Sequence, residues 1–572
     1  MDVVITYVDN CDENWVKTIR QFTDIPKDYD RRYRSWNNLK YCLRSIATNM
    51  SFVRKIFLVV SELSQVPKWI NKNEINIVYH KDIIPEKYLP TFNSRTIEMH
   101  LHNIKDLGEE FVYFNDDMFI INKSRYTDFF VNGKPCNILQ AYTEEEFKNK
   151  ITSNPVYLNP YKRCTDEAAN LLNITSKYYY FSNHGPNPLL KSVCKKVYNL
   201  LGDKLLNTFT PFRDEKNFVH FIYSIYQLLG GYTTDKVLKN KYIKYCNNLV
   251  SFHKDIRLIK ETCLCVNDFK SDKISIERMM FLFNEVMDMH FPNLSKFEMK
   301  PKVSLCTIVK NENKYLKEYV EHYLKLGFNK LYLYDNNDIH GETPMDVISE
   351  YIENGFVVYH DFRGKKVCQL EAYNDCYKRY SGENDWIAFF DADEFLELWR
   401  HDNISSFIVQ DIYKKYNCIK INWMCYGDNG QLKYEDKPVQ ERFTKPVIRE
   451  NNYYLGVNIN YYIKTIVKCK NSNVFWNDSV HIPSGVVCCN SLGIASPPTM
   501  YNKPFYNDIV LKHYITKSTE EYLEKIKRGY PDQVLSKNKI IGLLNKYFTI
   551  NDKTQENMNL INEEIKNVEI FF

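Results

Sequence analysis

The 572-residue sequence contains no long apolar run and no leader-like start. No stretch approaches the ~18 consecutive apolar residues of a membrane-spanning helix. The first residues, MDVVITYVDN, lack the basic segment and the apolar segment of a secretion signal. We therefore expect a soluble protein that has no transmembrane segment. We expect it in the cytoplasm, or in the host cytoplasm if the sequence is viral.

A strong excess of charge and a metal-binding cysteine pattern are also missing. Lys and Arg number 76 and Asp and Glu 71, so the net charge is only +5. No basic run follows, which argues against nucleic acid as a partner. The 16 cysteines do not form the spaced pairs of a zinc site. We expect free, mostly buried thiols in a reducing compartment.

The sequence does have ample apolar material and a repeated alternation of strand-like and helix-like patterns. Hydrophobic residues make up 44% and charged residues 26%, which is typical of globular proteins. The first half has strand patterns at 3–8, 55–60, 75–79 and 110–114 and helix patterns near 39–46 and 94–101. The second half has strand patterns at 303–309, 330–334, 356–359 and 385–390 and helix patterns at 315–326, 345–353 and 369–377.

This alternation predicts an α/β protein with two Rossmann-like, GT-A-like parallel-sheet domains for nucleotide-sugars. We place the domains at 1–295 and 300–572, with a mainly helical segment at 188–295 between the two sheets. In both halves the last strand of the series is followed by clustered carboxylates. Ligands bind beyond the carboxyl ends of parallel strands, so both clusters are candidate sites.

The first cluster is Asn115, Asp116 and Asp117. Adjacent carboxylates in a dry cleft repel each other unless a cation neutralises them, and a hard divalent cation bridging to phosphates is the usual solution. The alternative is an ordinary turn at a strand end. Asp9 and Asn10 follow the first strand and are expected on the same edge of the sheet.

The segments around this cluster carry a resemblance. DVVITYVDNCDENW, RYRSWNNLKYCLRSI, HKDIIPEKYLPTFNSRTIEMHLHNI and FVYFNDDMF occur in this order over residues 2–121. They resemble the first two conserved regions of the Stealth family of sugar-1-phosphate transferases. SNHGPNPLL and FRDEKNFVHF resemble its third and fourth regions more loosely. The resemblance implies an acidic active site and an essential histidine and arginine, at Asp9, Glu98, Asn115, Asp116, Asp117, His184 and Arg213.

The chemistry implied by that resemblance is attack of an acceptor sugar hydroxyl on the β-phosphorus of a UDP-sugar, with UMP as the leaving group. Asp116 and Asp117 would hold Mg²⁺ or Mn²⁺ and the pyrophosphate. Arg213 would hold phosphate oxygens, and His184 would be the general base. The structural alternatives are a turn histidine before Gly185 and a surface arginine at the start of a helix.

The second cluster is the D-x-D of WIAFFDADEFLEL. VSLCTIVKNENKY, QLEAYNDCYKRY, this segment and LKHYITKSTEEYLEKIKRGYPD together resemble glycosyltransferase family 92 and family 2-like relatives over about 303–531. The resemblance implies that two aspartates and a histidine bind a divalent metal and the donor phosphates, at Asp391, Asp393 and His513. It implies that three further residues border the nucleotide, at Lys310, Glu312 and Asp335.

In this half the expected reaction is glycosyl transfer from a nucleotide-sugar, with release of UDP. An inverting reaction needs a carboxylate base, for which Asp428 is the candidate and Glu394 the second choice. Structural alternatives stay open. In place of acting as a base, Glu394 would accept backbone hydrogen bonds. His481 would be a core or turn histidine, and Trp423 would be a core residue and not a platform for a sugar ring.

These observations favour a bifunctional enzyme that builds a phosphate-containing glycan from UDP-sugars or other nucleotide-sugars on a glycan or glycoconjugate acceptor. One alternative keeps only one half catalytic. Another is a carbohydrate-binding or scaffold protein without turnover. The donor sugar, the acceptor and the oligomeric state are not determined by the sequence.

Overall fold

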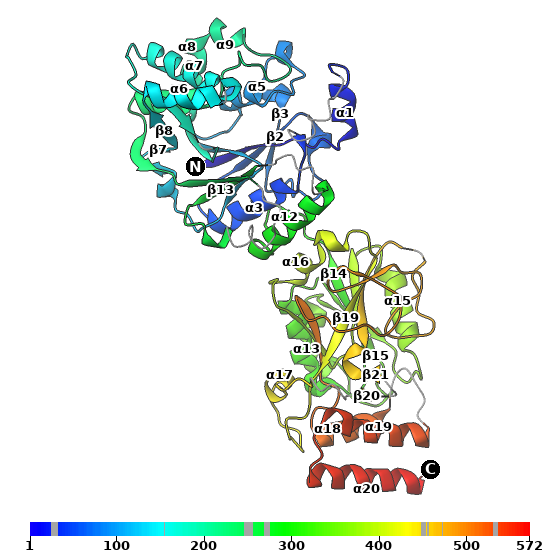
Figure 1. Cartoon of the computed structure of the whole chain (residues 1–572). Coiled ribbons are helices and arrows are strands. Elements are labelled where there is room, and N and C mark those ends of the chain that lie inside the picture. Colours follow the sequence, from blue (N-terminus) through cyan, green and yellow to red (C-terminus); the bar gives the residue numbers. More distant parts are fainter. Residues whose placement is uncertain are drawn as a thin grey trace. The chain divides into compact units, whose positions relative to one another are not determined.

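The computed structural model describes residues 1–23, 33–153, 155–182, 184–244, 256–267, 275–447, 453–454, 457–471, 473–529 and 536–571. The chain divides into two compact units, Met1–Met299 and Lys300–Phe572 (Figure 1). We call them the N-terminal unit and the C-terminal unit, and each is described separately.

The N-terminal unit is built on a five-stranded sheet in the order β10-β4-β1-β2-β3. Its strands are β1 (Asp2–Thr6), β2 (Ile56–Val60), β3 (Asn76–Tyr79), β4 (Glu110–Asn115) and β10 (Asn187–Leu190). All neighbours are parallel except β10, which runs antiparallel to β4. Because Thr6 pairs with Asn115, the carboxyl ends of β1 and β4 lie side by side.

Alternate side chains of β1 enter two hydrophobic clusters on the two faces of this sheet. Val3 and Ile5 pack with the helices of one face, α3 (Asn38–Asn49) and α12 (Ile276–His290). Val4 packs on the other face with α5 (Ser94–Met99), α7 (Pro155–Leu171), α8 (Lys191–Leu201) and α10 (Phe221–Leu229). Helices on both faces bury the sheet, which explains why its strands are almost continuously apolar.

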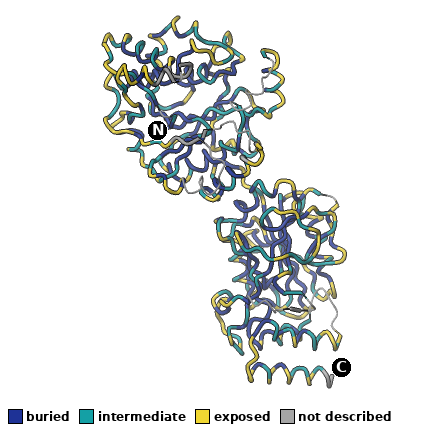
Figure 2. The backbone as a smooth tube through the Cα atoms, in the orientation of Figure 1, coloured by how far each residue is buried: buried dark blue, intermediate teal, exposed yellow. Residues whose placement is uncertain are grey.

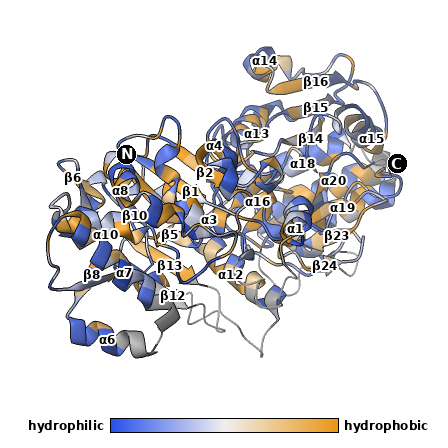
Figure 3. Ribbon diagram, turned by 90° about the horizontal axis from the view of Figure 1, so that it is seen from above, coloured by the Kyte–Doolittle hydropathy of each residue, from blue (hydrophilic) through white to orange (hydrophobic). Residues whose placement is uncertain are grey.

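Shorter elements complete this unit. The helices are α1 (Glu13–Ile19), α4 (His80–Ile83), α6 (Glu144–Ser153) and α9 (Asp203–Leu206). The strands are β5 (Met118–Ile120), β6 (Phe130–Val131), β7 (Lys134–Asn137), β8 (Leu139–Tyr142) and β9 (Tyr179–Ser182). The residues of α6 are mostly hydrophilic (Figure 3).

The segment 188–295, predicted to be mainly helical, holds the helices α8, α9, α10 and α12. It also contains β11 (Thr234–Val237), β12 (Asn240–Lys244) and β13 (Cys263–Asn267). β13 pairs antiparallel with β5, and β12 pairs parallel with β13. A short apolar run such as CLCV is ambiguous in sequence, and here a partner strand from far earlier in the chain makes it a strand.

The C-terminal unit holds one large mixed sheet with the strand order β16-β15-β14-β17-β22-β19-β23-β24. These strands are β14 (Val303–Val309), β15 (Leu331–Asp335), β16 (Val357–Asp361), β17 (Trp386–Phe389), β19 (Cys418–Cys425), β22 (Ile463–Lys468), β23 (Cys488–Asn490) and β24 (Ala495–Ser496). The first four in the order are parallel, and β22 is antiparallel to β17. β18 (Glu394–Leu398) pairs with β25 (Ile509–His513), which also pairs with β19, and β20 (Tyr453–Tyr454) pairs with β21 (Val457–Asn458).

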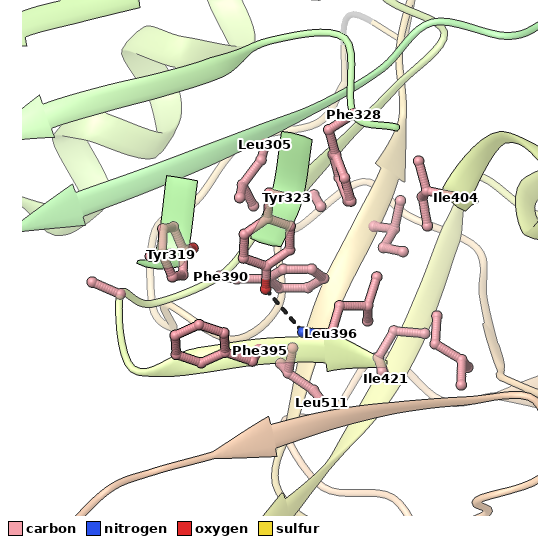
Figure 4. Close-up of a cluster of buried hydrophobic side chains, with 14 of the residues drawn as sticks. Leu305, Tyr319, Tyr323, Phe328, Phe390, Phe395, Leu396, Ile404, Ile421 and Leu511 are labelled. Atoms are coloured by element: carbon pink, nitrogen blue, oxygen red, sulfur yellow. Dashed lines mark hydrogen bonds between the residues drawn. The ribbon is translucent and has the colours of Figure 1, made fainter. Parts of the chain in front are cut away.

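In the described residues, eight α-helices accompany this sheet: α13 (Asn313–Lys325), α14 (Met345–Glu353), α15 (Gln369–Tyr380), α16 (Ile404–Ile408), α17 (Val439–Arg442), α18 (Thr519–Arg528), α19 (Lys537–Ile550) and α20 (Gln555–Phe571). The last three pack together through their own apolar cluster (Figure 1). Phe390 and Phe395 on either side of the D-x-D enter the main core, where Tyr323 accepts a hydrogen bond from Leu396 N (Figure 4).

The predicted α/β class with parallel sheets is confirmed, and burial is concentrated on the sheet strands of both units (Figure 2). The described cysteines are free thiols, and all of them except Cys11 are buried. Among the described helices, none combines the length and the apolar character needed to cross a bilayer.

Candidate active sites

In the N-terminal unit, the site lies at the carboxyl ends of β1 and β4. Asn115 ends β4 and is followed by Asp116 and Asp117. β10 runs antiparallel with Asn187 opposite Tyr113, so the residues just before β10 lie beside the end of β4. This register brings His184 to the aspartates. Its Nε2 lies 3.4 Å from Asn115 Nδ2.

The two aspartates share a strongly anionic environment. Burial and the neighbouring Asp117 carboxylate raise the pKa of Asp116 to about 8. Burial also raises the pKa of Asp117, although His184 opposes that effect. Asp117 Oδ1 has no hydrogen-bond partner among the described residues. A carboxylate pair in this state is stabilised by a cation.

His184 is held in an unusual backbone conformation. Its φ is +40°, a left-handed value that is rare for residues other than glycine. Asn240 Nδ2 donates a 2.9 Å hydrogen bond to the His184 carbonyl. A side chain at Gly185 would come within 2.5 Å of the same Asn240 atom, so glycine permits this close approach. A cavity of about 250 Å³ lies beside this turn, lined by residues that include Gln140 and Ser182.

A buried carboxylate stands behind the cluster. His220 Nδ1 lies 2.7 Å from Glu98 Oε2, and the Tyr113 hydroxyl donates to Glu98 Oε1 at 3.3 Å. Burial alone would raise the pKa of Glu98, but His220 and Arg213 lower it to about 2. The Tyr113 hydroxyl also lies 2.5 Å from Asn115 Oδ1, and this contact connects the network to the aspartates.

The other predicted residues of this site lie at its edge. Arg213 is exposed and donates from Nη2 to Ser94 Oγ at 2.6 Å, one helical turn before Glu98. Asp9 follows β1, and its Oδ1 accepts from Cys11 N at 2.9 Å. Asn10 is half-buried beside it. The structure therefore brings Glu98, Asn115 and His184 into one network. Arg213 reaches this network through Ser94, and Asp9 lies outside its hydrogen bonds.

In the C-terminal unit, Asp391 and Asp393 follow β17 at the carboxyl edge of the parallel strands. β22 pairs antiparallel with β17, with Phe389 opposite Thr465, so the preceding Lys464 reaches the D-x-D. Lys464 is fully buried and donates from Nζ to Asp391 Oδ1 at 2.8 Å. Gln369 Nε2 and the Tyr373 hydroxyl donate to the same oxygen at 2.8 and 3.2 Å.

Asp393 is bound by two groups from the end of the chain. Lys525 in α18 donates from Nζ to Asp393 Oδ2 at 2.5 Å, and His513 Nε2 lies 3.5 Å from the same oxygen. β25 brings His513 there because it pairs with Glu394. Burial would raise the pKa of Asp393, but Lys525 and His513 lower it well below its usual range.

A second ion cluster lies where β14 ends. Glu312 is buried and accepts from Arg528 Nη2, and Lys517 Nζ lies 3.7 Å from its Oε2. Arg528 Nη1 also donates to the Asn311 carbonyl at 2.6 Å. Lys310 Nζ lies 3.4 Å from Asp338 Oδ1. Glu312 and the Lys310 carbonyl are therefore tied to Arg528 of α18.

Asp335 is fully buried at the end of β15. Its Oδ2 accepts from the Tyr359 hydroxyl at 2.8 Å, and its Oδ1 accepts from Asn337 N at 2.9 Å. Asp335 thus organises the turn after its strand.

The two candidate bases of this unit are both engaged in structural contacts. Asp428 accepts from the Tyr547 hydroxyl and, at Oδ1, from Gly430 N at 2.9 Å. Glu394 is fully buried and accepts from Asp391 N at 2.8 Å. Burial, reinforced by both neighbouring aspartates, raises the pKa of Glu394 well above its usual range despite Lys464 nearby. A base role for either residue stays a prediction, and for Glu394 the geometry favours the structural alternative.

Trp423 is packed as a core residue, and the half-buried His481 lies beside it. Trp423 stacks on Tyr462 with ring centroids 5.2 Å apart and lies 4.2 Å from the His513 ring. His481 Nδ1 lies 2.9 Å from the Ile463 carbonyl. Burial and Lys464 lower the pKa of His481 to about 3, which keeps the ring neutral.

Comparison with known proteins assigns both units. The family model for Stealth protein conserved region 2 matches residues 32–137, and that for glycosyltransferase family 92 matches residues 302–568. A capsular polysaccharide phosphotransferase of Neisseria meningitidis serogroup B is 30% identical over 322 residues, covering 51% of this chain and 82% of that protein. The chain belongs to the Stealth family, and its C-terminal half matches the model of glycosyltransferase family 92. It is therefore a glycan-synthesising transferase.

Other relatives of this Stealth chain agree. The capsular polysaccharide phosphotransferase WcwK of Streptococcus pneumoniae is 29% identical over 334 residues, which cover 52% of this chain and 98% of WcwK. Among solved structures, S. aureus TarS with UDP-GlcNAc matches with 13% identity and a TM-score of 0.24 over 47% of this chain and 73% of TarS. The bifunctional glycosyltransferase WbbM matches with 8% identity and a TM-score of 0.24, covering 82% of this chain and 79% of WbbM. These scores are too low to support a functional argument.

The Stealth unit fits the divalent cation that we predicted. Asp116 and Asp117 supply hard oxygen ligands, and Asp117 Oδ1 lacks a partner among the described residues. Asp117, His184 and Cys265 offer ligand atoms within 4.8 Å of one another, but burial and Asp117 raise the pKa of the Cys265 thiol well above its usual range. Asp116 and Asp117 would hold the cation, which leaves the His184 ring for the role of base.

The family 92 unit fits a cation less well than predicted. The first aspartate of the D-x-D already binds a fully buried lysine, and the second binds a nearly buried one, at Lys464 and Lys525. A divalent ion coordinated by Asp391, Asp393 and His513 would have to replace the ammonium group on Asp393. The metal set predicted there does not fit this arrangement.

Sequence reasoning missed His220, Lys464 and Lys525. His220 lies in the quoted segment FRDEKNFVHF, and Lys525 lies in LKHYITKSTEEYLEKIKRGYPD, where only His513 was selected. The spacing of Glu521, Lys525 and Arg528 on one helix face was the available indication. Lys464 is a lone lysine in an apolar strand, and nothing in the sequence connects it with Asp391.

Proposed function

We propose that this chain catalyses two transfers in glycan synthesis, one in each unit. The N-terminal unit moves a sugar-1-phosphate from a UDP-sugar to a sugar hydroxyl with a divalent cation. The C-terminal unit transfers a glycosyl group from a nucleotide-sugar. The observation that carries the proposal is that each unit has its own functional cluster at the carboxyl edge of its own parallel strands.

In the N-terminal unit, His184 is the base that takes the proton from the acceptor hydroxyl. Its Nε2 faces the Asn115 amide, and an amide donor at this position holds Nε2 in the unprotonated form. Arg213 is exposed at the edge of the site and binds the phosphate oxygens of the donor. A bound divalent cation supplies charge neutralisation at the phosphate. Phosphoryl transfer depends mainly on such positioning and charge neutralisation.

The cavity beside His184 supports a place for the acceptor. It contains amide and hydroxyl groups from Gln140, Ser182 and Asn240 and apolar groups from Leu139 and Pro186. This mixture suits a sugar ring, which has polar edges and apolar faces. A glycan end in this cavity would bring its hydroxyl to the turn that carries His184.

The proposal is tested by the nucleotide that each unit releases. Incubation with a panel of UDP-sugars and Mg²⁺ or Mn²⁺ should yield UMP from the N-terminal unit and UDP from the C-terminal unit. Asp117→Asn should abolish UMP release only, and Asp391→Asn should abolish UDP release only. Each variant is the control for the other. If neither nucleotide appears with any donor, the chain binds carbohydrate without turnover, and if one is absent, only one unit is catalytic.

A further inference from the structure

The D-x-D of the C-terminal unit is surrounded by buried cations from two directions. Lys464 reaches Asp391 from β22, and Lys525 reaches Asp393 from α18. Lys517 and Arg528 reach Glu312. Four cationic side chains therefore face three paired carboxylates.

We propose that this unit neutralises the departing nucleoside diphosphate with lysine and arginine side chains of its C-terminal segment, and not with a divalent cation. The inference rests on the proposed glycosyl transfer in this unit. It assigns Lys525, Lys517 and Arg528 to the diphosphate of the donor and Lys464 to the permanent neutralisation of Asp391.

The geometry of α18 supports this assignment. Ser518 caps the helix and Glu521 completes the capping box, so its first turn is firmly placed. Lys525 and Arg528 lie one turn apart and contact the two ends of the carboxylate cluster, at Asp393 and at Glu312. A donor that crosses from the end of β14 to the D-x-D would therefore meet both side chains.

The charge balance points in the same direction. Without donor, four cationic side chains, Lys464, Lys517, Lys525 and Arg528, are paired with the three carboxylates of Asp391, Asp393 and Glu312. A fifth amine lies nearby, because burial and the Lys525 charge lower the pKa of Lys546 to about 8. Buried positive charge that exceeds its counter-charge is costly, and an anion of two negative charges would relieve it. A divalent cation at the same place would instead add to the excess.

The step that these cations assist is balanced without a further reactant. The bond between the anomeric carbon and the β-phosphate oxygen breaks, and its electron pair stays on that oxygen, so UDP leaves with one more negative charge. The acceptor oxygen forms the new bond to the anomeric carbon and loses its proton to a base. The Lys525 ammonium offers hydrogen bonds and charge where this new negative charge develops.

The chain contains its own control for testing the role of metal. One preparation is incubated with a UDP-sugar in EDTA and, separately, in Mn²⁺, and both released nucleotides are measured. We expect UMP release to stop in EDTA, whereas UDP release changes less than threefold. UDP release that falls more than tenfold in EDTA and returns with Mn²⁺ would overturn the inference.

Binding of UDP gives a readout that does not depend on turnover. Titration calorimetry of the Asp117→Asn chain, whose N-terminal site is disabled, should show a UDP affinity in EDTA within threefold of that in Mn²⁺. Lys525→Met should weaken UDP binding at least tenfold, and Lys525→Arg should retain most of it. The matched control is Lys527→Met in the same helix, because Lys527 is mostly exposed and pairs with Glu564, away from the cluster. Its UDP affinity should be unchanged.

The outcomes separate the two proposals. Binding of UDP only in the presence of metal overturns the neutralisation by lysine and leaves the glycosyl transfer standing. Failure of UDP to bind in either buffer overturns the proposed glycosyl transfer itself. The wild-type measurements in EDTA decide the question even if a Lys525 variant fails to fold.

Discussion

The role of His184 can be tested with a substitution that the backbone tolerates. His184 has a φ of +40°. The left-handed conformation costs an ordinary residue about 1–2 kcal/mol, and alanine adopts it less readily than histidine, so an alanine there would mix a folding effect with a catalytic one. Asparagine is among the residues that accept this conformation most readily. His184→Asn therefore removes the base and keeps the turn.

The expected loss follows from the role of a positioned base. General base catalysis contributes about 10²–10⁴-fold in rate. His184→Asn should lower kcat/KM for UMP release at least ~100-fold, which corresponds to about 2.7 kcal/mol in the activation free energy. The melting temperature and UDP release should stay close to the wild-type values, because the left-handed turn and the C-terminal unit are unaffected.

The pH dependence gives a second measurement of the same residue. Burial lowers the pKa of His184, and the Asp117 charge opposes this only in part. The base works in its neutral form, so the rate of UMP release should fall as pH drops through this lowered pKa, below about 6.5. This acid limb should vanish in His184→Asn. A variant that keeps more than a tenth of the activity, or an unchanged acid limb, would refute the assignment.

Three further predictions concern the N-terminal unit. Because the pKa of Asp116 is raised to about 8 in the folded state, the melting temperature in EDTA should fall as pH rises from about 4 through 8. Mg²⁺ should flatten this slope of melting temperature against pH. An Asp116→Asn variant with an unchanged slope would contradict the prediction. Glu98→Gln should reduce the free energy of unfolding by about 1–3 kcal/mol in urea titration. The double variant with His220→Gln should lose less stability than the sum of the two single losses. Additive losses would show that the pair is not coupled. Arg44→Met should lower the free energy of unfolding by about 3–5 kcal/mol, because it leaves Glu298 buried without its partner. The double variant with Glu298→Gln should recover part of that loss in the same urea titration. A double variant without any recovery would argue against this ion pair.

Local sequence patterns were sufficient for the main strands and for the acidic clusters. β4 and β17 are short apolar runs that end in carboxylates, and both the strand and its polar end are visible within about ten residues of sequence. Parallel pairing then fixes which edge these carboxylates occupy, since all carboxyl ends of a parallel sheet lie together. The positions of Asp117 and Asp391 follow from those two facts.

Pairings between distant segments were not visible in the same way. β13 is a strand because β5 accepts it, and His184 reaches Asp117 because β10 pairs antiparallel with β4. Whether CLCV becomes a strand or a helix depends on a partner more than 100 residues away, and local propensity does not specify that partner.

The sequence by itself therefore determined the class of the chain, its two parallel sheets and the carboxylates at their edges. Only the tertiary structure decided which charged side chains form ion pairs with those carboxylates. Lys464 and Lys525 approach the D-x-D through the register of β22 and the placement of α18. The physical reason is that the charge of a buried site depends on every group within a few ångströms, and most of these groups come from remote parts of the chain.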